Sequence, residues 1–311
     1  MTVLEDRLAE YLHVRRQLGF KLKLKLKLDG YLLADFVTFL ETAGAERITN
    51  DLSVMWARRP GASARYHMER LSMVRGFAQY LATIDPANEI PPIDLLHARE
   101  NRNAPYLYCE REIGELIAAA AALTPPQRGA TYRTVIGVLA ASGLRIGETL
   151  ALDRGDVDLE QGVLHIRDGK GRRHRDVPVH HTTTEVLRGY ARLRDRACRR
   201  PETPAFFIST IGARVTGSRF HKTFRKLIAQ VDPQPGREQA HRRPHDLRHT
   251  FAVQTLLGWH HAGVDIDRTM PLLSTYLGHS NPSSSYWYLQ ASPELMALVA
   301  NRLDNALGGR S

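Results

Sequence analysis

Residues 163–179, VLHIRDGKGRRHRDVPV, decide the fold class, because they predict a β-hairpin within a chain whose other apolar patterns favour helices. Residues 163–167 and 173–179 have the composition of short strands, and the glycines of DGKG at 168–171 suit a tight turn between them. The second part of the chain is therefore predicted to be α+β, mainly helical with a small antiparallel sheet.

Helical periodicity is found on both sides of this hairpin. Before it, helices are predicted at 110–122 and 131–142. After it, the chain is predicted to form one short apolar strand at 205–208 and helices at 182–198, 218–230, 245–257, 266–277, 283–290 and 293–307.

The first part of the chain is predicted to be a small all-helical bundle, with helices at 4–18, 30–43 and 64–83. Residues 21–28 alternate lysine and leucine, and this period of two favours an extended segment with one basic side. The segment either contacts phosphates or is a solvated charged strand or loop. Its lysines are Lys21, Lys23, Lys25 and Lys27.

A proline-rich segment separates the two parts. Residues 85–105 contain four prolines and few periodic apolar positions, which is typical of a linker. We therefore expect a helical domain at 1–85, a linker at 86–104 and a second domain at 105–311.

The composition favours a polyanionic partner. The 311 residues include 43 lysines and arginines against 33 aspartates and glutamates, a formal net charge of +10. Most of this surplus lies after residue 100, and arginine, which binds phosphate in bidentate fashion, far outnumbers lysine. Proteins with such a surplus of positive charge most often bind nucleic acid.

Several classes of protein are disfavoured. The two cysteines, Cys109 and Cys198, argue against a disulfide framework or a cysteine-ligated zinc site. No apolar run approaches the roughly 18–20 residues that span a bilayer. The first residues, MTVLEDRLAE, lack the basic-then-apolar order of a signal peptide, so we expect a cytoplasmic protein.

Two of the basic residues lie beside glycines. Gly143 can end one helix and leave Arg145 at the start of the next, where a guanidinium and free N–H groups suit an anion. A surface ion pair between Arg145 and Glu148 is the plainer alternative. Lys170, on the predicted hairpin tip, can either swing toward a ligand and donate a proton or serve only solubility.

Two further clusters follow toward the C-terminus. Pro244 favours a helix start, and His245 and Arg248, three residues apart, then share one helix face. His279 follows a glycine that breaks a helix, and Tyr286 and Tyr288 come shortly after it. Because those tyrosines lie roughly 200° apart on a helix, only one can face a common site.

These residues together suit phosphoryl transfer that uses neither a metal nor a nucleotide. Arginines neutralise the phosphate oxygens, a lysine protonates the departing oxygen and a histidine assists the incoming hydroxyl. A tyrosine can form the covalent intermediate. No cofactor is therefore expected.

Four segments in this order resemble the tyrosine recombinase (phage integrase) family. They are ASGLRIGETLALDRGDVDL at 141–159, GKGRRHRDVPV at 169–179, PHDLRHTFAV at 244–253 and LGHSNPSSSYWYL at 277–289. The resemblance implies the DNA breaking-and-rejoining fold, with a catalytic domain at 105–311 and a DNA-clamping, core-binding domain at 1–85. It also implies attack by tyrosine that leaves a 3′-phosphotyrosyl bond.

The resemblance assigns roles by position. It makes Arg145 and Arg248 the catalytic arginines, Lys170 the general acid, and Glu148 a residue that orients Arg145. The remaining catalytic residues are His245, His279 and Tyr288, which lies nine residues after His279, the usual family offset. DNA contacts are further expected of the four lysines above and of Arg172, Arg173, Arg242 and Arg243.

The resemblance further implies double-stranded DNA with a specific recombination site, a homotetramer on that DNA and a monomer or dimer when free. We therefore expect the protein to be associated with the nucleoid in a bacterial cytoplasm. The alternatives are a type IB topoisomerase-like enzyme and a non-catalytic DNA-binding protein of the same fold. Residues 258–270 look like an insertion relative to compact members, and the 293–307 helix is expected to dock on a neighbouring protomer or on its own domain.

Overall fold

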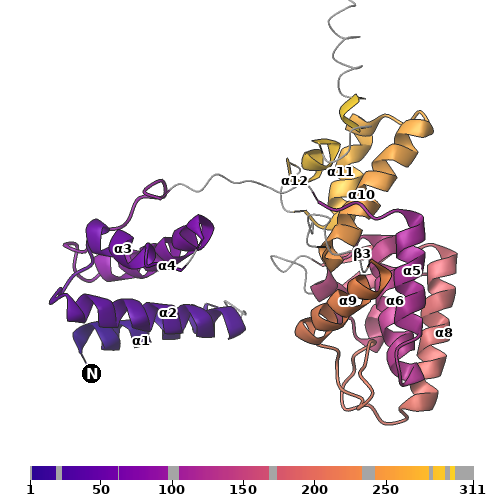
Figure 1. Cartoon of the computed structure of the whole chain (residues 1–311), viewed down its shortest axis with the longest axis horizontal. Helices are drawn as coiled ribbons and strands as arrows, with labels where there is room; N and C mark the ends of the chain where they lie inside the picture. The colour runs from indigo at the N-terminus through magenta and orange to yellow at the C-terminus, as the bar shows by residue number, and fades with distance from the viewer. Residues whose placement is uncertain are drawn as a thin grey trace, which may run out of the picture. The chain divides into compact units, whose positions relative to one another are not determined.

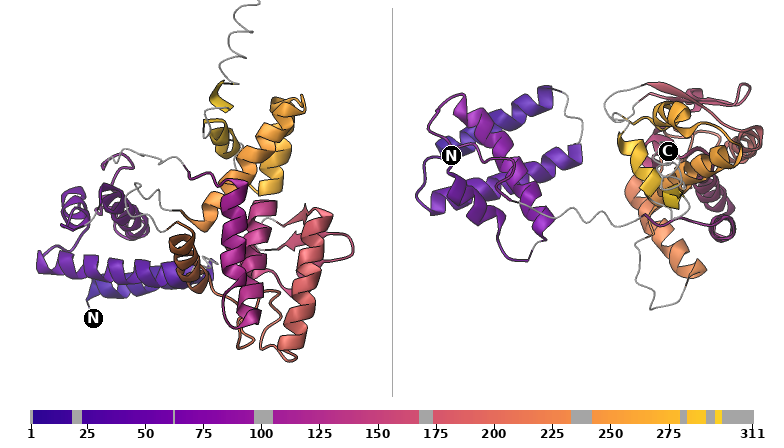
Figure 2. Two further views of the ribbon diagram at one scale, coloured as in Figure 1. Left: turned by 45° about the vertical axis from the view of Figure 1, so that its right-hand side comes forward. Right: turned by 90° about the horizontal axis from the view of Figure 1, so that it is seen from above.

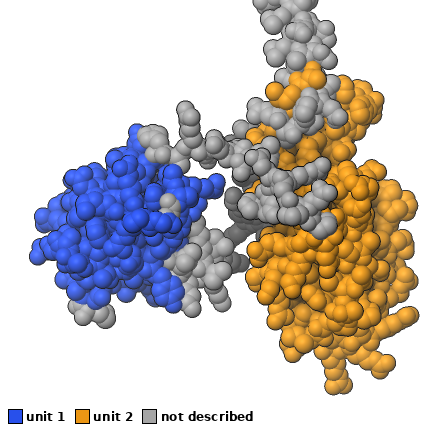
Figure 3. Space-filling model, in the orientation of Figure 1, with its two compact units in different colours: residues 1–102 blue, residues 103–311 orange. Residues whose placement is uncertain are grey.

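The computed structural model describes residues 2–18, 23–61, 63–96, 105–167, 174–232, 242–279, 283–290 and 295–297. The chain divides into two compact units, unit 1 (Met1–Arg102) and unit 2 (Asn103–Ser311), which Figure 3 colours separately. Each unit has its own hydrophobic core, so each is described by itself.

Unit 1 is helical throughout its described secondary structure (Figure 1). Its helices are α1 (Val3–Gln17), α2 (Lys23–Thr42), α3 (Asn50–Ala57) and α4 (Ala64–Ala82). Side-chain oxygens of Thr2, Thr49 and Ser63 cap the starts of α1, α3 and α4 by accepting backbone N–H bonds. The core between the helices is formed by fully buried apolar side chains, among them Leu33, Phe36, Trp56, Leu71 and Phe77.

The prediction of an extended segment from the lysine–leucine alternation is wrong. Residues 23–28 have a helical backbone and form the first turns of α2. Leucine and lysine are both strong helix formers, and a continuous helix through Thr42 satisfies the backbone better than a short isolated strand. Helix α3 was not predicted, because eight residues are too few to show clear periodicity.

The first half of the predicted linker packs on unit 1. The side-chain oxygen of Asn88 accepts the buried N–H of Ile48 at 3.0 Å, and the Arg75 guanidinium donates to the carbonyls of Pro91 and Pro92, both at 2.6 Å. Leu96 is 7% exposed within the same core. Residues 97–104 lie outside the described residues.

Unit 2 is built around one buried helix, α6 (Pro126–Ser142), which starts at a proline and has buried residues on all of its faces. Helices α5 (Glu110–Ala121), α8 (His181–Ala197) and α10 (Pro244–His261) pack against it. Helix α9 (Gly217–Val231) packs on α5, and Figures 1 and 2 draw α9 and α8 on opposite sides of the α5–α6 pair. The short helices are α7 (Ile146–Ala151) and the 3-10 turn η1 (Arg154–Asp156).

The predicted hairpin is confirmed. Strand β2 (Val163–Ile166) pairs antiparallel with β3 (Arg175–Pro178), with Leu164 opposite Val177, and β1 (Val157–Asp158) adds a short third strand. The predicted strand at 205–208 is wrong, because the segment forms only isolated bridges at its two ends. Its apolar side chains are buried without a partner strand, so burial alone produced the pattern.

The C-terminal part forms a smaller core. Helix α11 (Ile266–Leu277), α12 (Ser283–Tyr286) and the 3-10 turn η2 (Trp287–Gln290) follow α10. Residues 258–270, expected as an insertion, complete α10, turn at Gly263 and begin α11. Of the predicted 293–307 helix, residues 295–297 are described as helical, with Leu295 buried in this core. Among the described residues, no helix has the length and apolar character needed to cross a lipid bilayer.

Candidate active site

Two helix ends form the framework of the site. Helix α6 ends at Gly143 (φ +59°) and α11 ends at Gly278 (φ +68°), both in the left-handed conformation that glycine adopts without strain. A Cβ atom at Gly143 would lie 2.5 Å from Cδ1 of Phe251, so the close packing there also requires glycine. Both ends therefore present carbonyl groups that need donors.

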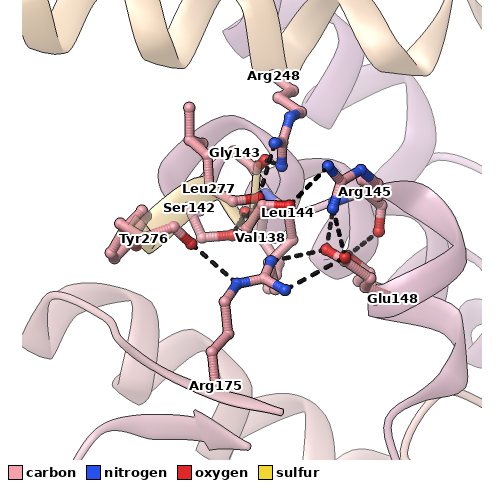
Figure 4. Close-up of polar contacts among 12 residues, drawn as sticks. Val138, Ser142, Gly143, Leu144, Arg145, Glu148, Arg175, Arg248, Tyr276 and Leu277 are labelled. Carbon is pink, nitrogen blue, oxygen red and sulfur yellow. Dashed lines mark hydrogen bonds and ion pairs between the residues drawn. The ribbon is translucent and has the colours of Figure 1, made fainter. Parts of the chain in front are cut away.

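Arg248 joins these two helix ends. It projects from α10, is 1% exposed, and donates from Nη1 to the Gly143 carbonyl at 2.8 Å and from Nη2 to the Leu277 carbonyl at 2.7 Å (Figure 4). Burial lowers the pKa of Arg248 to about 10, so the guanidinium is still charged at neutral pH. Three of its five N–H groups are not used by these carbonyls, and the Tyr288 side chain lies close enough to interact with the guanidinium.

Arg145 occupies the position between the helices α6 and α7 that the sequence predicted. Its Nη1 donates to Glu148 Oε1 at 2.8 Å and its Nη2 to the Gly278 carbonyl at 3.0 Å. Its backbone N–H donates to Glu148 Oε2 at 3.2 Å, which caps the start of α7. The Arg145 side chain is 23% exposed, so its inner side is held by these contacts while its outer side is accessible to solvent.

Glu148 is the buried counter-ion of this cluster. Its side chain is 4% exposed and binds Arg145 and also Arg175, whose Nη2 donates to Glu148 Oε2 at 2.8 Å. Burial alone would raise the pKa of Glu148, but the two guanidiniums hold it below its usual value. The pair is therefore not the surface ion pair that the sequence left open.

Three histidines lie around the arginines. The rings of His245 and His249 are 4.6 Å apart, and His249 is 5.5 Å from the ring of Tyr288. Burial, together with the positive charge of Arg248 and Arg145, lowers the pKa of His245 and of His279 to about 4. Burial and His245 lower that of His249 to about 3. All three rings are therefore neutral at pH 7.

Tyr288 is the tyrosine that faces this cluster. It is 2% exposed, and its ring stacks on that of His279 at 5.9 Å, whereas Tyr286 is 44% exposed. His279 in turn shares a hydrogen bond of 2.7 Å between Nδ1 and the hydroxyl of buried Ser285. Burial raises the pKa of Tyr288, and the charge of Arg248 opposes that shift.

The structure thus brings together most of the predicted catalytic residues. They are Arg145, His245, Arg248, His279 and Tyr288, with Glu148 behind Arg145. Lys170, Arg172, Arg173 and Lys21 lie outside the described residues, as do the side chains of Lys23, Lys25 and Lys27.

Arg242, expected to contact DNA, is held by acidic side chains of its own unit. Its side chain is 10% exposed and pairs with Asp232 at 2.8 Å and Glu112 at 3.3 Å. Its guanidinium also lies over the ring of Tyr106. Arg243, by contrast, has a side chain that is 59% exposed.

Sequence reasoning missed Arg175, His249 and Ser285. Arg175 shares the inward face of β3 with Val177, so the period-two pattern of the strand could have identified it. His249 follows Arg248 directly and therefore projects about 100° away from it on α10, yet its ring lies 5.5 Å from that of Tyr288. Ser285 gives no sequence signal beyond lying in a serine run.

Sequence reasoning also missed a basic helix face. Helix α9 buries Phe220, Phe224 and Leu227 and exposes cationic side chains on its other side. The exposed cations are Arg219, Lys222, Arg225 and Lys226. Among the described residues, no group of three or more His, Cys, Asp or Glu side chains is arranged to hold a metal ion.

Comparisons with known proteins agree on one family. Residues 109–294 match the phage integrase family model. The chain is 39% identical to y4rB of Sinorhizobium fredii (strain NBRC 101917 / NGR234), named as an integrase/recombinase, over 98% of both chains. It is 28% identical to the tyrosine recombinase XerC of Chlorobaculum tepidum, over 80% of this chain and 74% of that one.

A solved structure has the same fold. The XerH site-specific recombinase, bound to palindromic difH substrate in a post-cleavage complex, aligns with a TM-score of 0.67 and 18% identity. The alignment covers 91% of this chain and 79% of that chain. This chain belongs to the phage integrase family of tyrosine recombinases.

Proposed function

We propose that this protein is a site-specific DNA recombinase or integrase that cleaves and rejoins DNA through a 3′-phosphotyrosyl bond to Tyr288. The observation that carries the proposal is the position of Tyr288. Its ring is stacked on His279, and its hydroxyl is within reach of the charges of Arg248 and Arg145, which are held by the ends of α6 and α11. A tyrosine that serves only to fill a hydrophobic core does not require positively charged arginines beside it.

The reaction needs one bond to form and one to break. The Tyr288 phenol oxygen attacks the phosphorus, and the bond from phosphorus to the 5′ oxygen breaks. Neutral His245 or His279 can take the phenol proton, and Lys170 donates a proton to the departing 5′ oxygen. Attack by a 5′-hydroxyl on the phosphotyrosyl bond reverses these steps and rejoins a strand.

Arg145 and Arg248 supply the electrostatic stabilisation. Each guanidinium uses two donors on fixed acceptors, which leaves N–H groups for the non-bridging phosphate oxygens. Because both arginines are already oriented, little reorganisation is needed as charge develops in the transition state. The positive charge of the site comes from side chains, so we propose that neither a metal ion nor ATP takes part.

We propose double-stranded DNA with a specific recombination site as the partner. The net charge of +10 and the exposed cations of α9 suit a phosphate backbone. The XerH site-specific recombinase structure is a post-cleavage complex with a palindromic difH substrate. By the same analogy, unit 1 is the DNA-clamping domain, and the protein is a monomer or dimer that assembles as a homotetramer on DNA in a bacterial cytoplasm.

Covalent trapping tests the proposal. The protein is incubated, in the presence of EDTA, with nicked duplex oligonucleotides of randomised sequence, so that a cleaved fragment diffuses away and the adduct persists. Wild-type protein should form an adduct that is stable in detergent, and sequencing its DNA gives the target site. Tyr288→Phe should form none, whereas the exposed-tyrosine control Tyr286→Phe should still react. Adducts in Tyr288→Phe, or a strict requirement for Mg²⁺, would refute the proposed mechanism.

A further inference from the structure

We propose that Arg175 is a positioning residue that fixes the catalytic orientation of Arg145 through Glu148 and the end of α11. The inference rests on the proposed function, because it assumes that Arg145 binds the reacting phosphate. Arg175 begins β3, five residues after Lys170, and none of the roles assigned above includes it.

Every nitrogen of the Arg175 guanidinium has a protein acceptor. Nη2 donates to Glu148 Oε2 at 2.8 Å, Nη1 to Glu148 Oε1 at 3.3 Å and Nε to the Tyr276 carbonyl at 2.9 Å. The side chain is 10% exposed. Arg175 therefore acts on other residues, whereas Arg145, with its open side, is placed to meet a substrate.

Glu148 transmits the position of Arg175 to Arg145. The carboxylate binds one guanidinium on each side, so its two oxygens are fixed in a plane by the bidentate contact with Arg175. Without Arg175, a carboxylate with 4% exposure would keep only Arg145 as a partner. A buried charge that loses a partner is costly, so Glu148 would rotate or take up a proton, and Arg145 would lose its fixed acceptor.

The end of α11 provides the second link. Three consecutive carbonyls there, of Tyr276, Leu277 and Gly278, accept bonds from Arg175, Arg248 and Arg145 respectively (Figure 4). These carbonyls have no partners within the helix and carry its negative partial charge, which suits guanidiniums. One helix end thus sets the spacing of all three arginines.

The glycine at this helix end is explained by Arg175. A Cβ atom at Gly278 would lie 2.7 Å from Arg175 Nη1 and 2.8 Å from its Cζ. The guanidinium therefore lies directly against the Gly278 backbone, whose carbonyl holds Arg145. The same contact ties β3, the strand that follows the Lys170 segment, to the helix end that holds the arginines.

Variants of both charged partners test this role. The substrate is the nicked duplex whose sequence is recovered by covalent trapping, and the readouts are the single-turnover cleavage rate, the DNA affinity and the melting temperature. Arg175→Met should lower the cleavage rate about 100-fold, the order expected from misplacing a catalytic group, with unchanged DNA affinity. Arg175→Lys should restore little of the rate, because an ammonium cannot make the bidentate contact.

The double variant Arg175→Met/Glu148→Met separates positioning from stability. Removing both partners leaves no buried carboxylate without its second guanidinium, so the melting temperature should recover relative to Arg175→Met. The cleavage rate should stay low, because Arg145 still lacks its oriented acceptor. The matched control is Arg154→Met, which removes a surface ion pair with Asp195 and should cleave at the wild-type rate.

Each outcome has a definite meaning. A double variant that regains both stability and wild-type cleavage, or an Arg175→Lys protein with the wild-type rate, would overturn the positioning role alone. If Arg175→Met does not fold, these two variants still decide the question. A wild-type protein that forms no covalent adduct would instead refute the proposed function, and the role of Arg175 with it.

Discussion

At the scale of single residues, the site is built from arginines that cap helix ends. Gly143 and Gly278 end their helices in the left-handed conformation, and the carbonyls exposed there hold Arg248 and Arg145. The guanidiniums are thus positioned by backbone atoms, which move less than flexible side chains would. A change in the backbone conformation at either glycine should therefore lower the rate of DNA cleavage.

Gly278→Ala tests this dependence. Alanine at φ +68° costs about 1–2 kcal/mol, and its Cβ would displace the Arg175 guanidinium. We expect a lower melting temperature and a large loss of cleavage. The matched control is Gly258→Ala inside α10, where a Cβ meets nothing within 4 Å and alanine should stabilise by about 0.5–1 kcal/mol. Wild-type cleavage by Gly278→Ala would contradict the prediction.

The buried histidines predict how stability depends on pH. His245, His249 and His279 have folded-state pKa values of about 3 to 4, below the ordinary value of 6.5. Between these values the unfolded chain binds protons that the folded chain does not, so stability falls as the pH drops from about 6.5 toward 4. Thermal unfolding followed at a series of pH values should show this decline.

A histidine outside the proposed reaction isolates the effect. His249→Gln should flatten the pH dependence of the melting temperature, because one depressed titration is removed. His221→Gln, at an exposed position on α9, should leave the wild-type dependence unchanged. Identical pH profiles for wild type and His249→Gln would show that this histidine does not contribute.

At the scale of elements, sequence patterns predicted the longer elements that bury one apolar face, whereas the eight-residue helix α3 was missed. Helix α11 was predicted at its observed bounds, and the antiparallel pairing of β2 with β3 was predicted from two strand-like segments with glycines between them in the sequence. The strand predictions were wrong where a strand-like pattern of residues did not come from a strand. The alternation at 21–28 continues into a helix, and the apolar run at 205–208 is buried without becoming a strand.

The same distinction holds for the candidate site. Residues that carry the expected chemistry, such as Arg145 and Tyr288, could be predicted from their type and spacing. The contacts of Arg175 and His249 could not, because they join segments far apart in the chain. The contact of Ser285 with His279 is local, but a serine in a serine run gives no signal of it. Such contacts are set by tertiary packing, which local patterns do not record.

The exposed cations of helix α9 should contribute to DNA affinity and to its dependence on salt concentration. Replacing Lys222 and Lys226 with alanine should weaken binding to all sequences and reduce the slope of log affinity against log salt by about one unit for each lost phosphate contact. The control replaces Arg192 and Arg196, exposed on α8 on the other side of the α5–α6 pair, and should keep the wild-type slope. Equal slopes for both variants would exclude α9 from the interface.

At the scale of the whole molecule, the two units have separate cores. The apolar side chains buried in unit 1 belong to one cluster, and those of unit 2 belong to two others. Their chemistry also differs, because the arginines, histidines and tyrosine of the candidate site all lie in unit 2. A substitution in the core of unit 1 should therefore leave the core that surrounds the candidate site unchanged.

Matched leucine substitutions test this independence. Leu71→Ala in unit 1 and Leu187→Ala in unit 2 each remove a side chain with 1% exposure or less, and each should cost about 2–5 kcal/mol. Calorimetry should show that each variant lowers the unfolding transition of its own unit and leaves the other in place. Leu187→Ala should also reduce covalent trapping near its lowered transition, because the site residues unfold with that core. A single transition that shifts equally in both variants would mean that the two cores unfold as one cooperative unit.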